Sequence, residues 1–218
     1  TGPTGSGKTT TLRVCLSLKA CEPLSVMTLE DPVEYEVPGV RHVHIRHAHG
    51  VTFASALRSS LRQDPDVIMV GEIRDNETAT TAINTALTGH LVLSTLHTTS
   101  AVDTILRLSQ MGIPGYLAAA TMRLIVSQRL IRVICRECTG ARTDCKICRG
   151  SGFHGRSVIA EILPIDSVLR DMISRGEDIK VIRDHVLSHG FCSMSHDADE
   201  KVDWGVTTRS EVMRALNS

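Results

Sequence analysis

Short apolar runs alternate with segments of helical periodicity in the first half of the chain. Three apolar runs predict buried strands, at residues 24–29, 67–70 and 91–95. Between the first two, Phe53, Leu57 and Leu61 recur at every fourth position and so lie on one stripe of a helix. Residues 76–87 predict a second helix before the third strand. Strands that alternate with helices are typical of an α/β fold, in which both faces of a parallel sheet are covered.

The second half of the chain has a more helical pattern. Residues 100–110 and 113–134 predict two helices, which a glycine and a proline separate. A cysteine-rich segment follows at residues 135–148, and an apolar, strand-like run occupies residues 158–163. Short amphipathic helices are expected from there to the end of the chain.

Composition and charge restrict the classes of protein that fit this pattern. Hydrophobic residues make up 42 % of the 218 residues, and the chain has 16 glycines. Taken together, they give an apolar share that is ordinary for a globular domain. The 24 basic and 24 acidic residues cancel, and aromatic residues are only 3 %, so we expect no direct nucleic-acid partner. No run of about 18 uncharged apolar residues is present, so no membrane-spanning helix is predicted.

Residues 2–9, Gly-Pro-Thr-Gly-Ser-Gly-Lys-Thr, match the phosphate-binding pattern G-x-x-x-x-G-K-[ST]. The glycines let backbone N–H groups surround a phosphate, and the helix that follows adds the partial positive charge of its N-terminus. Lys8 would reach the β- and γ-phosphates, and the hydroxyl of Thr9 would bind magnesium. The predicted nucleotide-binding residues are Gly2, Pro3, Thr4, Gly5, Ser6, Gly7, Lys8, Thr9 and Thr10. Such a loop follows a buried strand, so we expect that strand to lie outside these 218 residues.

Polar residues follow each of the three predicted strands. Glu30, Glu72 and His97 come directly after or within two residues of an apolar run. The carboxyl ends of parallel strands meet at one edge of a sheet, where ligands bind. We therefore expect these side chains and the phosphate-binding loop to converge on one nucleotide.

Four of the seven cysteines form two C-x-x-C pairs, at Cys135, Cys138, Cys145 and Cys148. Two such pairs can complete a tetrahedral zinc site, with Zn–S bonds of about 2.3 Å and sulfurs about 3.8 Å apart. Only six residues separate the pairs, whereas zinc ribbons often have about 15–20 there. We favour structural zinc, because four cysteines leave no open coordination position. Uncoordinated thiols and an iron–sulfur cluster are the alternatives.

A run of histidines at His42, His44, His47 and His49 suggests a second metal site. A spacing of two places His42 and His44 on one face of a strand. Ordinary polar positions explain this run better than a metal site.

Four blocks of the chain, taken in order, closely resemble the type II secretion and type IV pilus assembly (extension) ATPases. They are residues 2–9, 28–35, 61–75 and 88–98, which correspond to the Walker A, Asp box, Walker B and His box motifs of that family. The resemblance runs from residue 1 to residue 216 and includes Gln128-Arg129-Leu130. It implies a RecA-like P-loop NTPase core, ATP hydrolysis with Mg²⁺, and a structural Zn²⁺ on the four cysteines.

The resemblance also implies the setting in which the protein works. Family members form homo-hexamers that act on an inner-membrane platform protein, so a cytoplasmic protein peripheral to that membrane is expected. On this basis we divide the chain into an ATPase core at 1–112, a connecting helix at 113–134, a tetracysteine zinc knuckle at 135–155, and a mostly helical subdomain at 156–218. The family's N-terminal domain, which supplies arginines across subunits, would lie outside these residues.

The resemblance also suggests roles for individual side chains. Gly71 occupies the place where P-loop proteins usually have a magnesium-binding aspartate, and Glu72 would orient or deprotonate the attacking water. Glu30 would be the second catalytic carboxylate. His97 and His90 would form the His-box pair that senses the γ-phosphate. The structural alternatives are a salt-bridged strand-end Glu72, an ion pair between Glu30 and Arg74, and histidines that only stabilise the fold.

Two other functions remain open at this point. A pilus retraction ATPase has the same core motifs, but retraction members generally lack the four cysteines. A nucleotide-binding interaction module that does not hydrolyse would explain the loop, but not the presence of both Glu30 and Glu72.

Overall fold

The computed structural model describes residues 1–140 and 143–217. Within these residues, four parallel strands form a sheet in the order β2-β1-β3-β4. The strands are β1 (Val26–Glu30), β2 (Val40–His44), β3 (Val67–Val70) and β4 (Leu91–Ser94). Every residue of the central strands β1 and β3 is buried, including Thr28 and Glu30 of β1. The predicted α/β class with a parallel sheet is therefore confirmed.

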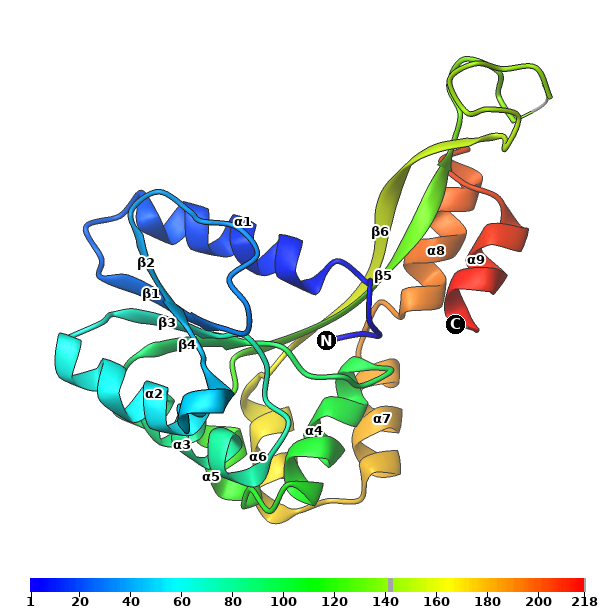
Figure 1. Cartoon of the computed structure of the whole chain (residues 1–218). Helices are drawn as coiled ribbons and strands as arrows, with labels where there is room; N and C mark the ends of the chain where they lie inside the picture. Colours follow the sequence, from blue (N-terminus) through cyan, green and yellow to red (C-terminus); the bar gives the residue numbers. More distant parts are fainter. Residues whose placement is uncertain (141–142, 218) are drawn as a thin grey trace.

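Helices cover both faces of this sheet, as Figure 1 shows. The helices are α1 (Lys8–Ala20), α2 (Phe53–Ser60) and α3 (Asn76–Leu87), with 3-10 turns η1 (His47–His49) and η2 (Leu61–Gln63) beside them. On one face Leu16 of α1 packs on Val26 and Met69. On the other face Leu57 of α2 packs in the main core with Ile68. Neighbouring strand residues thus point to opposite faces, and each face finds a helical cover.

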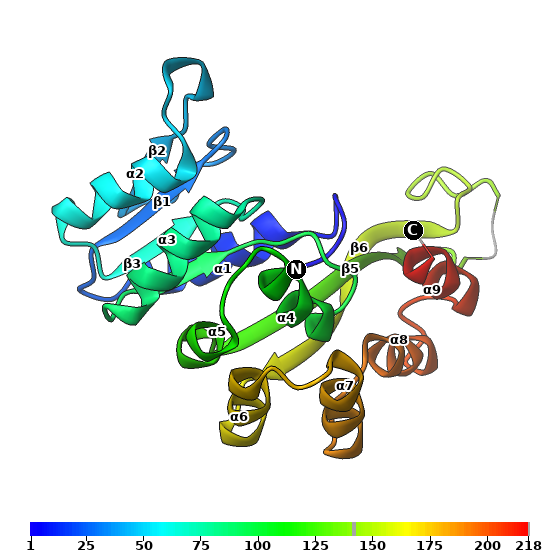
Figure 2. The same ribbon diagram turned by 90° about the horizontal axis from the view of Figure 1, so that it is seen from below.

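A long antiparallel ribbon follows the sheet. Its strands are β5 (Leu124–Ile134) and β6 (Phe153–Pro164). The other helices are α4 (Ala101–Gln110), α5 (Gly115–Thr121), α6 (Ser167–Arg175), α7 (Ile179–Ser188), α8 (Met194–Asp203) and α9 (Arg209–Leu216). In Figure 2, α8 and α9 lie along the ribbon, while α6 and α7 lie at its other end. No helix in the described ranges is both long and apolar enough to cross a membrane.

The prediction of one connecting helix over residues 113–134 is wrong. Only residues 115–121 are helical, and residues 124–134 form β5. The apolar residues of this segment also fit a strand, and pairing with β6 decides between the two. Ile131 of β5 and Ile159 of β6 become completely buried against α8 and α9. The other predicted boundaries between parts of the chain stay predictions.

A buried carboxylate joins the ribbon to two helices. Glu161 of β6 accepts hydrogen bonds from the backbone N–H of Ala101 at 2.5 Å and of Met194 at 3.4 Å. These residues begin α4 and α8, whose first N–H groups have no partner within their helices. One negative side chain therefore stabilises two helix N-termini and fixes α8 relative to the core.

Candidate functional site

A cavity of about 510 Å³ opens at the carboxyl-terminal edge of the parallel sheet. Residues 4–10 form one wall, and Glu30, Glu72 and His97 line it from the ends of three strands. The structure thus brings these three predicted residues together with the loop. This agrees with the expectation that strand ends converge at one edge.

The phosphate-binding loop has the backbone that its glycines permit. Gly5 and Gly7 have φ angles of 78° and 89°, a region that other residues rarely adopt. Helix α1 begins immediately afterwards at Lys8, so its N-terminus faces the cavity. The Lys8 ammonium donates to the carbonyls of Gly2 at 2.8 Å and Pro3 at 2.9 Å. Burial lowers the pKa of Lys8, and the charge of Glu72 partly opposes that change.

A side chain from β5 supports the loop from outside the cavity. Buried Gln128 donates from Nε2 to the Ser6 carbonyl at 2.8 Å and accepts at Oε1 from the Thr11 hydroxyl at 2.8 Å. A Cβ on Gly7 would lie 3.1 Å from the same Nε2. Gln128 had no predicted role, because residues 113–134 were expected to form a helix. Two other ribbon residues, Leu130 and Arg156, line the cavity itself and were not predicted to do so.

Glu72 lies in a network of cationic and polar groups. Its Oε2 accepts from Arg74 Nε at 2.6 Å and lies 3.5 Å from His97 Nε2. Arg74 therefore pairs with Glu72. The alternative prediction of an ion pair between Arg74 and Glu30 is wrong. Gly71 packs closely on β1, since a Cβ there would lie 3.1 Å from the Leu29 carbonyl oxygen. This contact explains why the preceding position holds glycine.

Glu30 has a different environment. It is 7 % exposed and ends β1 at the cavity. Its Oε1 accepts from the Thr28 hydroxyl at 2.6 Å and lies 3.0 Å from Nδ1 of His42. Glu30 and Glu72 are therefore held by separate sets of partners.

Comparison with known proteins adds an independent finding to this geometry. Residues 1–214 match the family described as type II/IV secretion system protein. The chain belongs to this family. The resemblance drawn from the four motif blocks is thereby confirmed.

Curated members of the family match nearly all of the chain. The type II secretion system protein HxcR of Pseudomonas aeruginosa is 43 % identical over 220 residues, which cover 98 % of this chain and 47 % of that protein. The type IV pilus assembly ATPase PilB of Thermus thermophilus is 40 % identical, with 98 % of this chain and 27 % of PilB covered. The chain spans about half the length of these relatives or less.

Two solved ATPase structures are similar in fold to this chain. The Legionella pneumophila ATPase DotB superposes with a TM-score of 0.78 at 26 % identity, covering 98 % of this chain and 57 % of DotB. The pilus retraction motor PilT, solved with ADP, gives a TM-score of 0.77 at 31 % identity, covering 98 % and 59 %.

His90 was predicted to form the His-box pair with His97, but it does not line the cavity. It precedes β4, whereas His97 follows it, so the two histidines lie at opposite edges of the sheet. His90 Nδ1 contacts the Thr88 hydroxyl at 3.0 Å and the Thr85 carbonyl at 3.1 Å, at the end of α3. Within this chain the structure therefore does not bring His90 to Glu72, and its contacts agree with the structural alternative.

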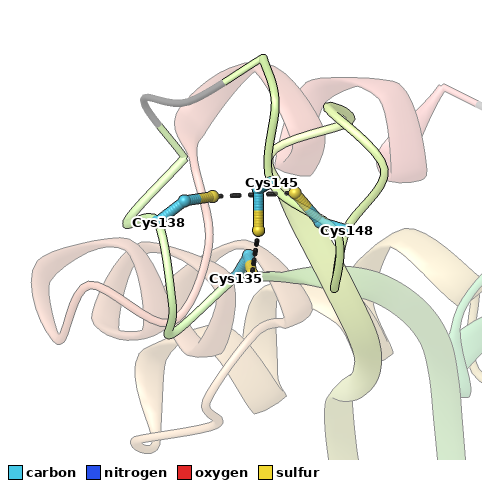
Figure 3. Close-up of side chains that lie close together, drawn as sticks. All are labelled: Cys135, Cys138, Cys145 and Cys148. Atoms are coloured by element: carbon cyan, nitrogen blue, oxygen red, sulfur yellow. Dashed lines mark hydrogen bonds between the residues drawn. The ribbon is translucent and has the colours of Figure 1, made fainter.

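The four cysteines between β5 and β6 form one cluster, and in Figure 3 their side chains point toward one another. Their sulfurs all lie within 4.8 Å of one another, and all four residues are buried. The distance is 3.9 Å from Cys135 to Cys145 and 3.6 Å from Cys138 to Cys148. These separations fit the edges of a tetrahedral zinc site, about 3.8 Å, and are far too long for a disulfide. Burial raises the pKa of the Cys135 thiol to about 11.

The histidine run does not form a second cluster of this kind. His42 faces Glu30, whereas His44 and His47 lie 3.9 and 3.3 Å from oxygens of Asp31. In residues 1–140 and 143–217, the four cysteines are the one group of three or more metal-binding side chains close enough to share an ion.

Proposed function

We propose that the chain is the ATP-hydrolysing part of a secretion or pilus assembly ATPase, with a RecA-like P-loop core. The observation that carries this proposal is the cavity in which Lys8 and the helix N-terminus face Glu30 and Glu72. Cations and N–H groups on one wall suit the phosphates of ATP, and carboxylates on the other suit its hydrolysis. Family membership supports the same substrate.

Each group in the cavity has a task in this proposal. The loop amides and Lys8 bind the β- and γ-phosphates and so stabilise the charge that develops during transfer. Glu72 orients the attacking water and takes its proton as the water oxygen bonds to the γ-phosphorus. The bond from that phosphorus to the β–γ bridging oxygen breaks, and ADP leaves with this oxygen. Arg74 fixes the carboxylate of Glu72. His97, which is in contact with Glu72, senses the γ-phosphate. The hydroxyl of Thr9 would hold Mg²⁺, which neutralises charge on the phosphate oxygens.

The larger assembly also belongs to the proposal. By resemblance to the family, the full protein would form a homo-hexamer that acts on an inner-membrane platform from the cytoplasmic side. The relatives are named as secretion and pilus assembly proteins, which supports the pathway. The likeness to PilT makes retraction the second candidate. The cysteine cluster favours assembly, since retraction motors generally lack it. Zinc held by this cluster would be structural.

Substitution of Glu72 tests the proposal. In the full-length protein, Glu72→Gln should bind ATP as the wild type does and hydrolyse it at least about 100-fold more slowly, because the base is lost. Glu77→Gln is the matched control, since Glu77 is exposed and pairs with Arg58 outside the cavity. Steady-state phosphate release and binding of a fluorescent ATP analogue provide the two readouts. Normal turnover in Glu72→Gln would remove Glu72 from its role, and binding without turnover in the wild type would favour a non-hydrolysing module.

A further inference from the structure

The side of Glu30 that faces away from the cavity contacts a small polar network under α1. Thr28 and Glu30 are two residues apart on β1 and share a face of the strand. The register of the sheet places His42 of β2 directly beside Thr28. The three side chains therefore meet between β1, β2 and the helix above them.

The hydrogen bonds of this network define the state of His42. The backbone N–H of Val37 donates to His42 Nε2 at 2.9 Å. That nitrogen must then carry its lone pair, so the proton of the neutral ring is on Nδ1. Val37 is 5 % exposed, and its N–H would lose its partner if the ring turned.

The Nδ1 atom of His42 lies beside both Glu30 and Thr28. It is 3.0 Å from Glu30 Oε1 and 2.9 Å from the Thr28 hydroxyl oxygen, so its proton is within hydrogen-bonding distance of both. The Thr28 hydroxyl donates to the same Oε1 at 2.6 Å. His42 and Thr28 thus both contact one oxygen of the carboxylate on its buried side.

The other oxygen of Glu30 is left for the cavity. Among the described residues, no hydrogen bond or ion pair engages Oε2, and Glu30 lines the 510 Å³ cavity. A carboxylate held by one oxygen has a fixed plane and presents the second oxygen in one direction. Pre-organisation of this kind lowers the cost of aligning a reacting group.

We propose that His42 and Thr28 are positioning residues of the ATPase site, which hold Glu30 by Oε1 so that Oε2 faces the nucleotide. This inference rests on the proposed function, in which Glu30 acts on the nucleophile or the metal. His42 itself does not line the main cavity and acts only through Glu30. The backbone N–H of Val37 sets its tautomer.

Kinetics of the full-length protein test this arrangement. His42→Leu should lower kcat about tenfold, by analogy with the outer groups that orient metal-site ligands, and change the KM for ATP less than threefold. His42→Gln should restore most of the rate, because an amide offers one donor to Glu30 and one acceptor to Val37. His44→Leu is the control on the same strand, since His44 is half-exposed and faces Asp31. Thr28→Val, nearly isosteric, should lower kcat even where His42→Leu fails to fold.

A double-mutant comparison separates this proposal from the role of Glu30. Glu30→Gln should lower kcat. Adding His42→Leu to this variant should lower kcat no further, since both changes abolish the same positioned carboxylate. A loss in Glu30→Gln with full activity in His42→Leu and Thr28→Val would overturn the positioning role alone. Full activity in Glu30→Gln would show instead that Glu30 has no catalytic part. An additive effect of His42→Leu in the Glu30→Gln background would show that His42 does not act through Glu30.

Discussion

The carboxylates of Glu30 and Glu72 differ in what holds them. Glu72 contacts Arg74 and His97, whereas Glu30 contacts a hydroxyl and a neutral imidazole N–H. Glu72 is therefore held by side chains that line the cavity, whereas Glu30 is held by side chains of strands β1 and β2. This difference suits one carboxylate that works on the water and another that provides a fixed point.

A third carboxylate has a structural task in the C-terminal part of the chain. Glu211 of α9 is 1 % exposed and accepts hydrogen bonds from Arg214 of the same helix and from Arg132 of β5. The bonds from Arg132 tie α9 to β5. The hydrogen bonds from Arg214, followed by those from Arg132, lower the pKa of Glu211 from 4.5 to about 2. The folded state therefore favours the carboxylate more than the unfolded chain does.

We predict a pH-dependent loss of stability in Glu211→Gln. The contribution of Glu211 is complete above about pH 5 and disappears as the pH falls toward 2, because the unfolded chain binds the proton first. At pH 7 the variant should be less stable by about 2 kcal/mol, given that both arginines are half-exposed. Urea unfolding at several pH values measures the difference in free energy of unfolding between variant and wild type. This difference should disappear on acidification. A difference independent of pH would contradict the assignment, and Glu22→Gln, at an exposed surface pair, is the control.

At the scale of elements, the prediction succeeded where local pattern and tertiary structure agree. Residues 67–70 are both an uninterrupted apolar run and a central strand, and residues 76–87 form the predicted helix with Asp75 as its cap. The prediction failed at β5, whose partner β6 begins only after the cysteine segment. Local periodicity cannot report a pairing between segments so far apart. The roles of Gln128, Leu130 and Arg156 at the site depend on that pairing and could not be predicted.

The cysteine cluster at the tip of the ribbon should contain zinc. Elemental analysis of the folded protein is expected to give about one zinc per chain, because four buried sulfurs already lie at tetrahedral separations. Removal of the metal by a chelator should lower the Tm, since its binding free energy contributes to folding. Cys145→Ser should lose the metal and Cys192→Ser, at an exposed cysteine, should retain it. A zinc content near zero in a folded sample would contradict the site.

At the scale of the whole molecule, most of the candidate site could be predicted because its residues follow strand ends within short motifs. Lys8, Glu30, Glu72 and His97 come together for that reason. His90 lies outside the cavity because it precedes β4, whereas His97 follows that strand. Two residues of one sequence motif can therefore lie at opposite ends of a strand. The support of Glu30 by His42 could not be predicted, since it depends on the neighbouring strand and on the N–H of Val37.

We have proposed that this cavity hydrolyses ATP within a ring. Steady-state phosphate release by the full-length protein, with ATP and magnesium and across protein concentration, tests this directly. We expect release that requires magnesium and a rate per chain that rises with concentration as rings assemble. Bound ATP with no phosphate release at any concentration would contradict it.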